Sequence, residues 1–167
     1  SVTKKAAELE LDLGGFGKGY AVDRMADELS EWDIRNFMIH GGMSSVYAAG
    51  KMKARNGWKI TISHPESGRF LQRLLLSNVA LGASGLRKGR HVIDPRTGMP
   101  VRAVYASWSL APDAATADAI STALLILSEE ERELYFRKHP EQGGFVLSDA
   151  ANKNGIRFGA WSQAHVW

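Results

Sequence analysis

The fold is decided first by residues 9–32, which read LELDLGGFGKGYAVDRMADELSEW. Leu9 and Leu11 alternate with acidic residues, a pattern typical of a half-buried strand, and the glycines that follow predict a tight loop. Beyond the loop, apolar residues recur at helical spacing from Val22 to Trp32, with charged residues between them. This spacing predicts an amphipathic helix. We therefore expect a strand, a glycine loop and a helix, in that order.

The remaining chain predicts further strands and two more helices. Period-2 patterns or short apolar runs predict strands over residues 36–40, 46–49, 58–63, 71–76, 79–81, 101–108, 145–148 and 156–161. Turns are expected at residues 82–85, at 94–98 and at Asn154-Gly155, the last a hairpin signal. A buried helix is expected over 114–127, and a second from Ser128, where Ser128 and Glu131 form a capping box, to before Pro140. This order favours an α+β domain with a mainly antiparallel sheet.

Composition excludes several classes of protein. The chain has 167 residues, of which 44% are hydrophobic, enough for one domain with a sizeable core. Its net charge of +3 is too small and too evenly mixed for a dedicated nucleic-acid binder. No apolar run approaches the roughly 20 residues that a membrane helix needs. The absence of cysteine excludes disulfides, thiolate zinc sites and a cysteine nucleophile.

The loop at residues 12–20, DLGGFGKGY, is the first candidate site. A glycine-rich turn at the start of a helix presents backbone N–H groups in a positive dipole field, which suits a phosphate group, and Lys18 adds a positive charge. The string is not a P-loop, because Gly19 follows Lys18 where Ser or Thr is required. An ordinary tight turn explains the same glycines, so the spacing leaves both interpretations open.

A second candidate is the basic segment at residues 87–98, RKGRHVIDPRTG. Its cationic side chains could neutralise a polyphosphate, and His91 could move a proton near neutral pH. The Asp94-Pro95 pair and Gly98 predict a turn. A solvated basic turn with a structural histidine is the alternative.

The third candidate lies inside the expected apolar helix. Asp118 and Thr122 are four residues apart, so their oxygens share one face, and Ser121 lies close to it. Carboxylate and hydroxyl oxygens favour Mg²⁺ or Ca²⁺ over Zn²⁺, and Mg²⁺ commonly keeps waters and substrate phosphates as further ligands. The alternative is that Thr122 bonds back to the helix while Asp118 pairs with an arginine.

Together, a phosphate loop, a cationic turn with a proton-transfer group and a hard-metal carboxylate are what phosphoanhydride chemistry needs. In order and wording these segments resemble the FAD:protein FMN transferases, the ApbE family. The resemblance runs from about Leu9 to the C-terminus, and the string HVIDPRTG is its most specific part. It rests on residues 12–23, Gly41-Gly42, Ser84-Gly85, 91–98 and 117–123.

The resemblance implies a T-fold-like α+β domain over residues 1–167, with a mainly antiparallel sheet packed by helices. It also implies a Mg²⁺-dependent enzyme that cleaves FAD, transfers FMN to a threonine or serine hydroxyl of a target flavoprotein and releases AMP. Some relatives instead hydrolyse FAD to FMN and AMP. A flavin-binding module without catalysis is the third possibility.

Site residues follow from the same resemblance. Asp118 and Thr122 match the family's side-chain metal ligands, and the backbone carbonyl of Gly17 completes the protein's share of that site. His91 matches the histidine that activates the acceptor hydroxyl, which is the role of a general base. The residues expected in segments that line the flavin nucleotide are Asp12, Gly15, Lys18, Ser84, Asp94 and Thr97.

Two departures from the family pattern are visible. Family members are longer, and the extra part precedes the glycine loop, so we expect this chain to be a fragment or a short form without that segment. Ala83 stands where the family often has Thr before Ser-Gly. The resemblance also implies a location outside the cytoplasm, in the periplasm or secreted, with any lipid anchor outside this chain.

Overall fold

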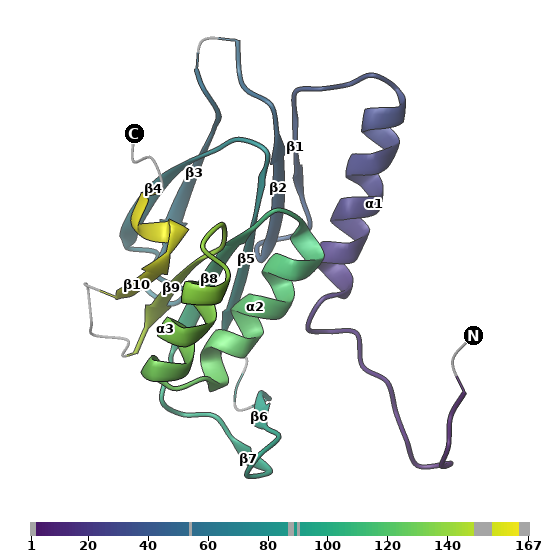
Figure 1. The fold of residues 1–167 in the computed structure, drawn as a ribbon, viewed down its shortest axis with the longest axis vertical. Coiled ribbons are helices and arrows are strands. Elements are labelled where there is room, and N and C mark those ends of the chain that lie inside the picture. The colour runs from purple at the N-terminus through teal and green to yellow at the C-terminus, as the bar shows by residue number, and fades with distance from the viewer. Residues whose placement is uncertain (1–2, 54, 87–88, 90, 149–154, 164–167) are drawn as a thin grey trace.

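A computed structural model describes residues 3–53, 55–86, 89, 91–148 and 155–163. Its central feature is a six-stranded antiparallel sheet with the order β1-β2-β5-β8-β9-β10 (Figure 1). These strands are β1 (Phe37–His40), β2 (Ser45–Ala49), β5 (Val79–Gly85), β8 (Ala106–Ala111), β9 (Gly143–Leu147) and β10 (Ile156–Gly159). Two antiparallel pairs lie outside this sheet: β3 (Trp58–Ser63) with β4 (Phe70–Leu76), and β6 (Ile93–Asp94) with β7 (Met99–Pro100).

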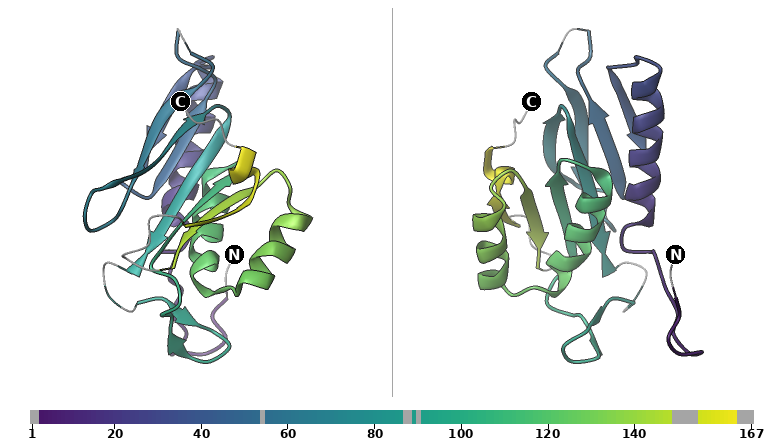
Figure 2. Two further views of the ribbon diagram at one scale, coloured as in Figure 1. Left: turned by 90° about the vertical axis from the view of Figure 1, so that its left-hand side faces the viewer. Right: turned by 45° about the vertical axis from the view of Figure 1, so that its right-hand side comes forward.

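Helices complete the fold and cover one face of the sheet. They are α1 (Gly17–Glu31), α2 (Ala114–Ile126), α3 (Glu129–Lys138) and the short 3-10 helix η2 (Ala160–Gln163). The three α-helices lie on one face and the β3–β4 hairpin lies on the other (Figure 2). The molecule therefore has three layers, and the predicted α+β fold is confirmed. Among the described residues, no helix combines the length and the apolar character that crossing a membrane requires.

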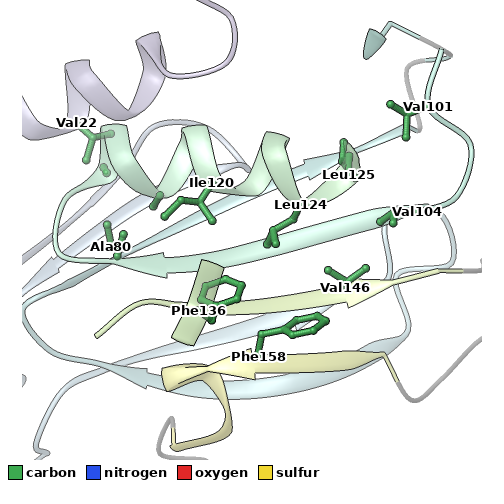
Figure 3. Close-up of a cluster of buried hydrophobic side chains, with 13 residues drawn as sticks. Val22, Ala80, Val101, Val104, Ile120, Leu124, Leu125, Phe136, Val146 and Phe158 are labelled. Atoms are coloured by element: carbon green, nitrogen blue, oxygen red, sulfur yellow. The ribbon is translucent and has the colours of Figure 1, made fainter. Parts of the chain in front are cut away.

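Apolar cores lie on both faces of the central sheet. Under the helices, Val22 of α1 and Leu124 of α2 pack with Val146 of β9 (Figure 3). On the opposite face, Ile60 of β3 packs in a second cluster with Trp108 of β8. Burial of apolar surface stabilises the fold by roughly 25 cal/mol per Å². The central strands are consequently covered on both sides.

Strand β8 shows what such a central position requires. All six of its residues are buried. Trp108 packs against the β3–β4 layer, whereas Ser107 and Ser109 bond to α2. Ser107 donates to the carbonyl of Ser121 at 2.6 Å, and Ser109 donates to that of Ala117 at 2.5 Å. Because an unpaired buried hydroxyl is costly, these bonds allow small polar side chains beneath a closely packed helix.

The predictions for α2 and α3 are confirmed. Asp113 precedes α2 and accepts a hydrogen bond from the backbone N–H of Thr116 at 2.7 Å. Ser128 and Glu131 form the predicted capping box, with the Glu131 N–H donating to Ser128 Oγ at 3.2 Å and the Ser128 N–H donating to Glu131 Oε2 at 2.7 Å. These caps satisfy N–H groups that a helix cannot bond internally.

Helix α1 is also confirmed, but its buried face is narrower than the sequence indicates. Val22 and Ala26 are buried, whereas Met25 and Trp32 are 45% and 78% exposed. The helix lies at the edge of the helical layer (Figure 1), so only one side of it meets other elements.

The strand predicted from Leu9 to Asp12 is wrong. This segment has no regular structure, and Leu9 and Leu11 are 54% and 79% exposed. It projects from the body of the molecule (Figure 1), and no strand in the described part of the chain pairs with it. Alternation does not make a strand without a partner for its N–H and C=O groups.

The turn predicted at residues 82–85 is also wrong, because all four residues belong to β5. Gly82 pairs with Ser109 of β8. It also lies so close to α2 that a Cβ at this position would overlap the carbonyl group of Ala117. This glycine therefore serves the approach of a helix to a strand, not a change in chain direction.

Other predicted turns are confirmed, and one strand is shorter than predicted. The strand expected over 101–108 begins only at Ala106. The turn from Asp94 to Gly98 joins β6 to β7; the Gly98 N–H donates to the Asp94 carbonyl at 2.8 Å, and Gly98 has a φ of +67°. Strands β9 and β10 pair as the hairpin signal predicts, although Asn154 lies outside the described residues.

We expect Gly82→Ala to lower the free energy of unfolding by about 1–3 kcal/mol, because the added methyl group collides with the backbone of α2. Urea denaturation of the two chains measures this difference. Gly85→Ala in the same strand is the control, since its Cβ would meet other atoms at 3.4 Å or more. The close approach is not the reason for glycine if both variants unfold at the same urea concentration.

Candidate functional site

The carboxylate of Asp118 lies at the centre of the candidate site, on α2, and the residue is only 4% exposed. The backbone N–H of Gly19, in the first turn of α1, donates to its Oδ2 at 2.8 Å. The hydroxyl of Ser45, the first residue of β2, lies 2.6 and 2.8 Å from its two oxygens. These donors stabilise a charge that would otherwise be very unfavourable in the interior. Three elements therefore meet at one carboxylate.

Hydroxyl groups extend this site toward the surface. Ser84, near the end of β5, has its Oγ 2.8 Å from Ser121 Oγ and 3.0 Å from Thr122 Oγ1. Thr122 donates back to the Asp118 carbonyl at 3.3 Å, as one interpretation of the sequence expected. The alternative pairing of Asp118 with an arginine is wrong, since its partners among the described residues are Gly19 and Ser45.

The glycine loop uses most of its backbone N–H groups within the protein. The Gly14 N–H donates to Oδ1 of Asp12 at 2.7 Å, which makes Asp12 a turn-forming residue at the start of the loop. The N–H of Gly17 donates to the Leu13 carbonyl at 2.7 Å, and that of Gly19 donates to Asp118. The loop is thus not an open array of donors.

Gly15 and Lys18 are the exceptions in this loop. Both residues are exposed, and their backbone N–H groups make no hydrogen bond within the described part of the chain. A Cβ on Gly15 would meet nothing within 4 Å. If a phosphate binds at this helix start, these two N–H groups and the Lys18 ammonium are the donors that remain for it.

His91 is exposed and has a defined tautomer. Its Nδ1 lies 2.9 Å from the carbonyl oxygen of Gly89. A carbonyl only accepts, so Nδ1 carries the hydrogen and Nε2 keeps its lone pair. His91 is therefore arranged to accept a proton at Nε2.

Arg96 connects the following turn to the helices. Its guanidinium donates to Asp94 at 2.9 Å, to Glu131 at 2.9 Å and to the Ile126 carbonyl at 3.1 Å. Hydrogen bonds from Arg96 lower the pKa of Asp94. The backbone N–H of Ser128 and the Arg96 side chain lower the pKa of Glu131, and both carboxylates raise the pKa of Arg96. The turn is tied to the end of α2 and the start of α3.

Two groups of expected site residues consequently lie apart. Ser84, Asp118 and Thr122 come together, whereas Arg96 holds the Asp94 turn beside Ile126. Eight residues of helix between positions 118 and 126 correspond to about 12 Å along its axis. Thr97, in the same turn, accepts from the Met99 N–H at 3.2 Å. One face of α2 thus separates an oxygen-rich centre from a charged turn.

Sequence reasoning missed Ser45 and the N–H of Gly19 as partners of Asp118. A polar residue at the start of a strand predicted to be buried was the available signal for Ser45, which is 0% exposed. Gly19 gave no such signal, because a backbone N–H is present at every residue except proline.

The donors present fit Mg²⁺. No group of three or more His, Cys, Asp or Glu side chains arranged for a metal occurs within the described residues. One carboxylate from Asp118 with the neutral oxygens of Thr122 and Ser84 instead suits Mg²⁺, because waters and substrate phosphates fill most of its positions. Gly17 lies two residues before Gly19, on the same turn of α1, and its carbonyl stays a predicted ligand.

A family model described as the ApbE family matches residues 1–145. The FAD:protein FMN transferase of Haemophilus influenzae is 31% identical over 144 residues, which cover 78% of this chain and 41% of that protein. The protein of the same name from Rhodobacter capsulatus is 34% identical over 133 residues, which cover 74% of this chain and 25% of that protein. The chain therefore spans less than half the length of these relatives.

Solved structures agree with the fold. The ApbE protein of Thermotoga maritima has a TM-score of 0.78 at 25% identity, over 92% of this chain and 53% of that one. The flavin transferase ApbE of Vibrio cholerae has a TM-score of 0.79 at 22% identity, over 98% of this chain and 55% of that one.

We expect Arg96→Gln to lower the Tm at neutral pH, because it removes the partner of two carboxylates. The pKa values of Asp94 and Glu131 are depressed in the folded chain, so this stabilisation is present above their ordinary values of 3.8 and 4.5 and is lost as pH falls through the folded values. Thermal unfolding should show the difference between the chains vanish in acid. Arg102→Gln, which changes an exposed arginine, is the control; an Arg96→Gln effect that persists in acid contradicts the charge explanation.

Proposed function

The chain belongs to the ApbE family, and from this premise we propose that it carries the metal- and nucleotide-binding part of an FAD:protein FMN transferase. In this proposal residues 1–167 act as one ApbE-like domain. FMN passes from FAD to a threonine or serine hydroxyl of an acceptor flavoprotein, and AMP is released. The names of the relatives support the flavin-transfer chemistry. The family resemblance supports a location outside the cytoplasm, in the periplasm.

One observation carries this proposal: Asp118 is buried, bonded to Gly19 and Ser45, and adjoins the hydroxyls of Thr122 and Ser84. Asp118, Thr122 and the Gly17 carbonyl would hold Mg²⁺. The ion would supply positive charge that stabilises the negative charge developing on the pyrophosphate of FAD. The chain's own contribution is to fix the carboxylate through its two hydrogen-bond donors.

His91 is the general base of this proposal. Its Nε2 lone pair accepts the proton of the acceptor hydroxyl as the oxygen attacks the FMN phosphorus. A new O–P bond forms, the pyrophosphate P–O bond breaks, and AMP leaves with the electron pair. The lining residues Asp12, Gly15, Lys18, Ser84, Asp94 and Thr97 stay predicted contacts of the nucleotide. An extended dinucleotide such as FAD is long enough to reach from the Asp118 centre to the Asp94 turn.

We expect His91→Ala to lower the rate of FMN transfer by about 10²–10⁴-fold. The measurement follows AMP and the flavin-bearing acceptor by chromatography, with FAD, Mg²⁺ and a threonine-containing acceptor. His139→Ala is the control, because His139 is exposed at the end of α3.

The products distinguish the competing functions. Free FMN without labelled acceptor would replace the transferase by an FAD hydrolase, and bound FAD without AMP would replace it by a binding module. His40 also bonds a carbonyl through Nδ1, to Gly42 at 2.7 Å. Loss of transfer in His40→Ala but not in His91→Ala would move the role of base to His40.

Asp118→Asn should abolish Mg²⁺-dependent release of AMP, because the amide lacks the charge that attracts the ion. Asp113→Asn on the same helix is the control, since its carboxylate caps α2 and touches none of the oxygens of the site. Calorimetry should show Mg²⁺ binding to the control and not to Asp118→Asn. Equal activity of Asp118→Asn and the parent would exclude both enzymatic functions.

A further inference from the structure

Asp23 connects α1 to the beginning of α2 by two hydrogen bonds. Its Oδ1 accepts from the backbone N–H of Ala114 at 2.7 Å, and its Oδ2 accepts from that of Ala115 at 2.9 Å. These are the first two residues of α2. Both oxygens of one carboxylate on α1 are thus bonded to the start of another helix.

The start of α2 requires acceptors, because the first N–H groups of a helix have no partner inside it. Asp113, the residue before α2, bonds only the N–H of Thr116. Asp23 satisfies the two N–H groups that remain before it. A carboxylate also interacts favourably with the positive end of a helix dipole. The complete cap of α2 therefore comes from two aspartates, one local and one from α1.

Asp23 lies one helical turn after Gly19, on the same face of α1. Gly19 approaches the same turn of α2 so closely that a Cβ there would overlap the carbonyl of Ala114. Gly19 is also the residue whose N–H donates to Asp118 at 2.8 Å. The two helices consequently meet at two points, the side chain of Asp23 and the backbone of Gly19.

We propose that Asp23 is a positioning residue, whose paired bonds to Ala114 and Ala115 fix α1 against α2 and thereby keep the Gly19 N–H on the carboxylate of Asp118. A hydrogen bond of 2.8 Å weakens with a displacement of a few tenths of an ångström. Two bonds from one rigid carboxylate resist sliding of α1 along α2. The consequence for the metal rests on the proposed function, whereas the geometric consequence at Gly19 does not.

Asp23 and Asp113 together allow a matched comparison. Each caps the same end of α2 through a bond of 2.7 Å, so each should cost similar stability when changed to Asn. Only Asp23 belongs to α1. A purely structural role predicts the same behaviour for both variants, whereas positioning predicts that they differ at Gly19.

The first experiment is amide hydrogen exchange of the whole chain by NMR. We expect exchange at the Gly19 N–H to rise about tenfold or more in Asp23→Asn relative to the most protected amides of the same variant. In Asp113→Asn the same ratio should stay within about twofold of the parent. Equal ratios at Gly19 in the two variants would overturn the proposal.

Asp23→Glu keeps the charge but displaces the carboxylate by one methylene, and it serves if Asp23→Asn does not fold. Because the proposal depends on the place of the two oxygens, Gly19 exchange should rise in Asp23→Glu as well. Unchanged exchange in this variant would mean that charge alone matters, and would overturn the positioning role.

A second readout is the affinity for Mg²⁺ alone, measured by calorimetry. Asp23→Asn should weaken it about tenfold, and Asp113→Asn should leave it within about twofold of the parent. Faster exchange at Gly19 with unchanged Mg²⁺ affinity would overturn the link to the metal. A parent chain that binds no Mg²⁺ would count against the proposed function, while the exchange experiment would still decide the role of Asp23.

Discussion

The approach of one helix backbone to another is the constraint on which this structure depends. At Gly19, α1 meets the first turn of α2 without an intervening side chain, and this closeness lets its N–H reach Asp118. Gly82 plays the same part on the other side of α2, where β5 meets the carbonyl of Ala117. Helix α2 is therefore held between two glycines, and neighbouring strands bring Ser45 and Ser84 to the same face. Packing of small residues, more than any single motif, assembles the oxygens.

Local signals predicted those parts of the fold that are decided locally. The capping box at Ser128, the turn at Asp94 and the helical spacing of Asp118 and Thr122 each depend on residues within a few positions of one another. Sequence patterns did not predict contacts across the chain, such as Gly19 with Asp118 at a separation of 99 residues and Ser45 with Asp118 at 73. The glycine at 82 was misassigned to a turn for the same reason: the partner that requires a missing Cβ lies on another element.

Helix α2 organises the chemistry by its length. Its N-terminal half carries the buried carboxylate, and its C-terminal end holds the Asp94 turn through the carbonyl of Ile126. A rigid helix keeps such groups at a constant separation, whereas two loops would have to be ordered separately. Residues that read as one motif in the sequence therefore act at two places on one scaffold.

The order of the central sheet also says how the third layer is attached. Ala48 of β2 pairs directly with Val79 of β5, although all of β3 and β4 lies between them in the chain. Strands β2 and β5 are thus two arms of one hairpin, and the covering layer is an elaboration of its loop. Changes in the length or outer surface of that elaboration would leave the pairing of β2 with β5 in place. The fold thereby separates a part that can diversify among lineages from the strands that carry Ser45 and Ser84.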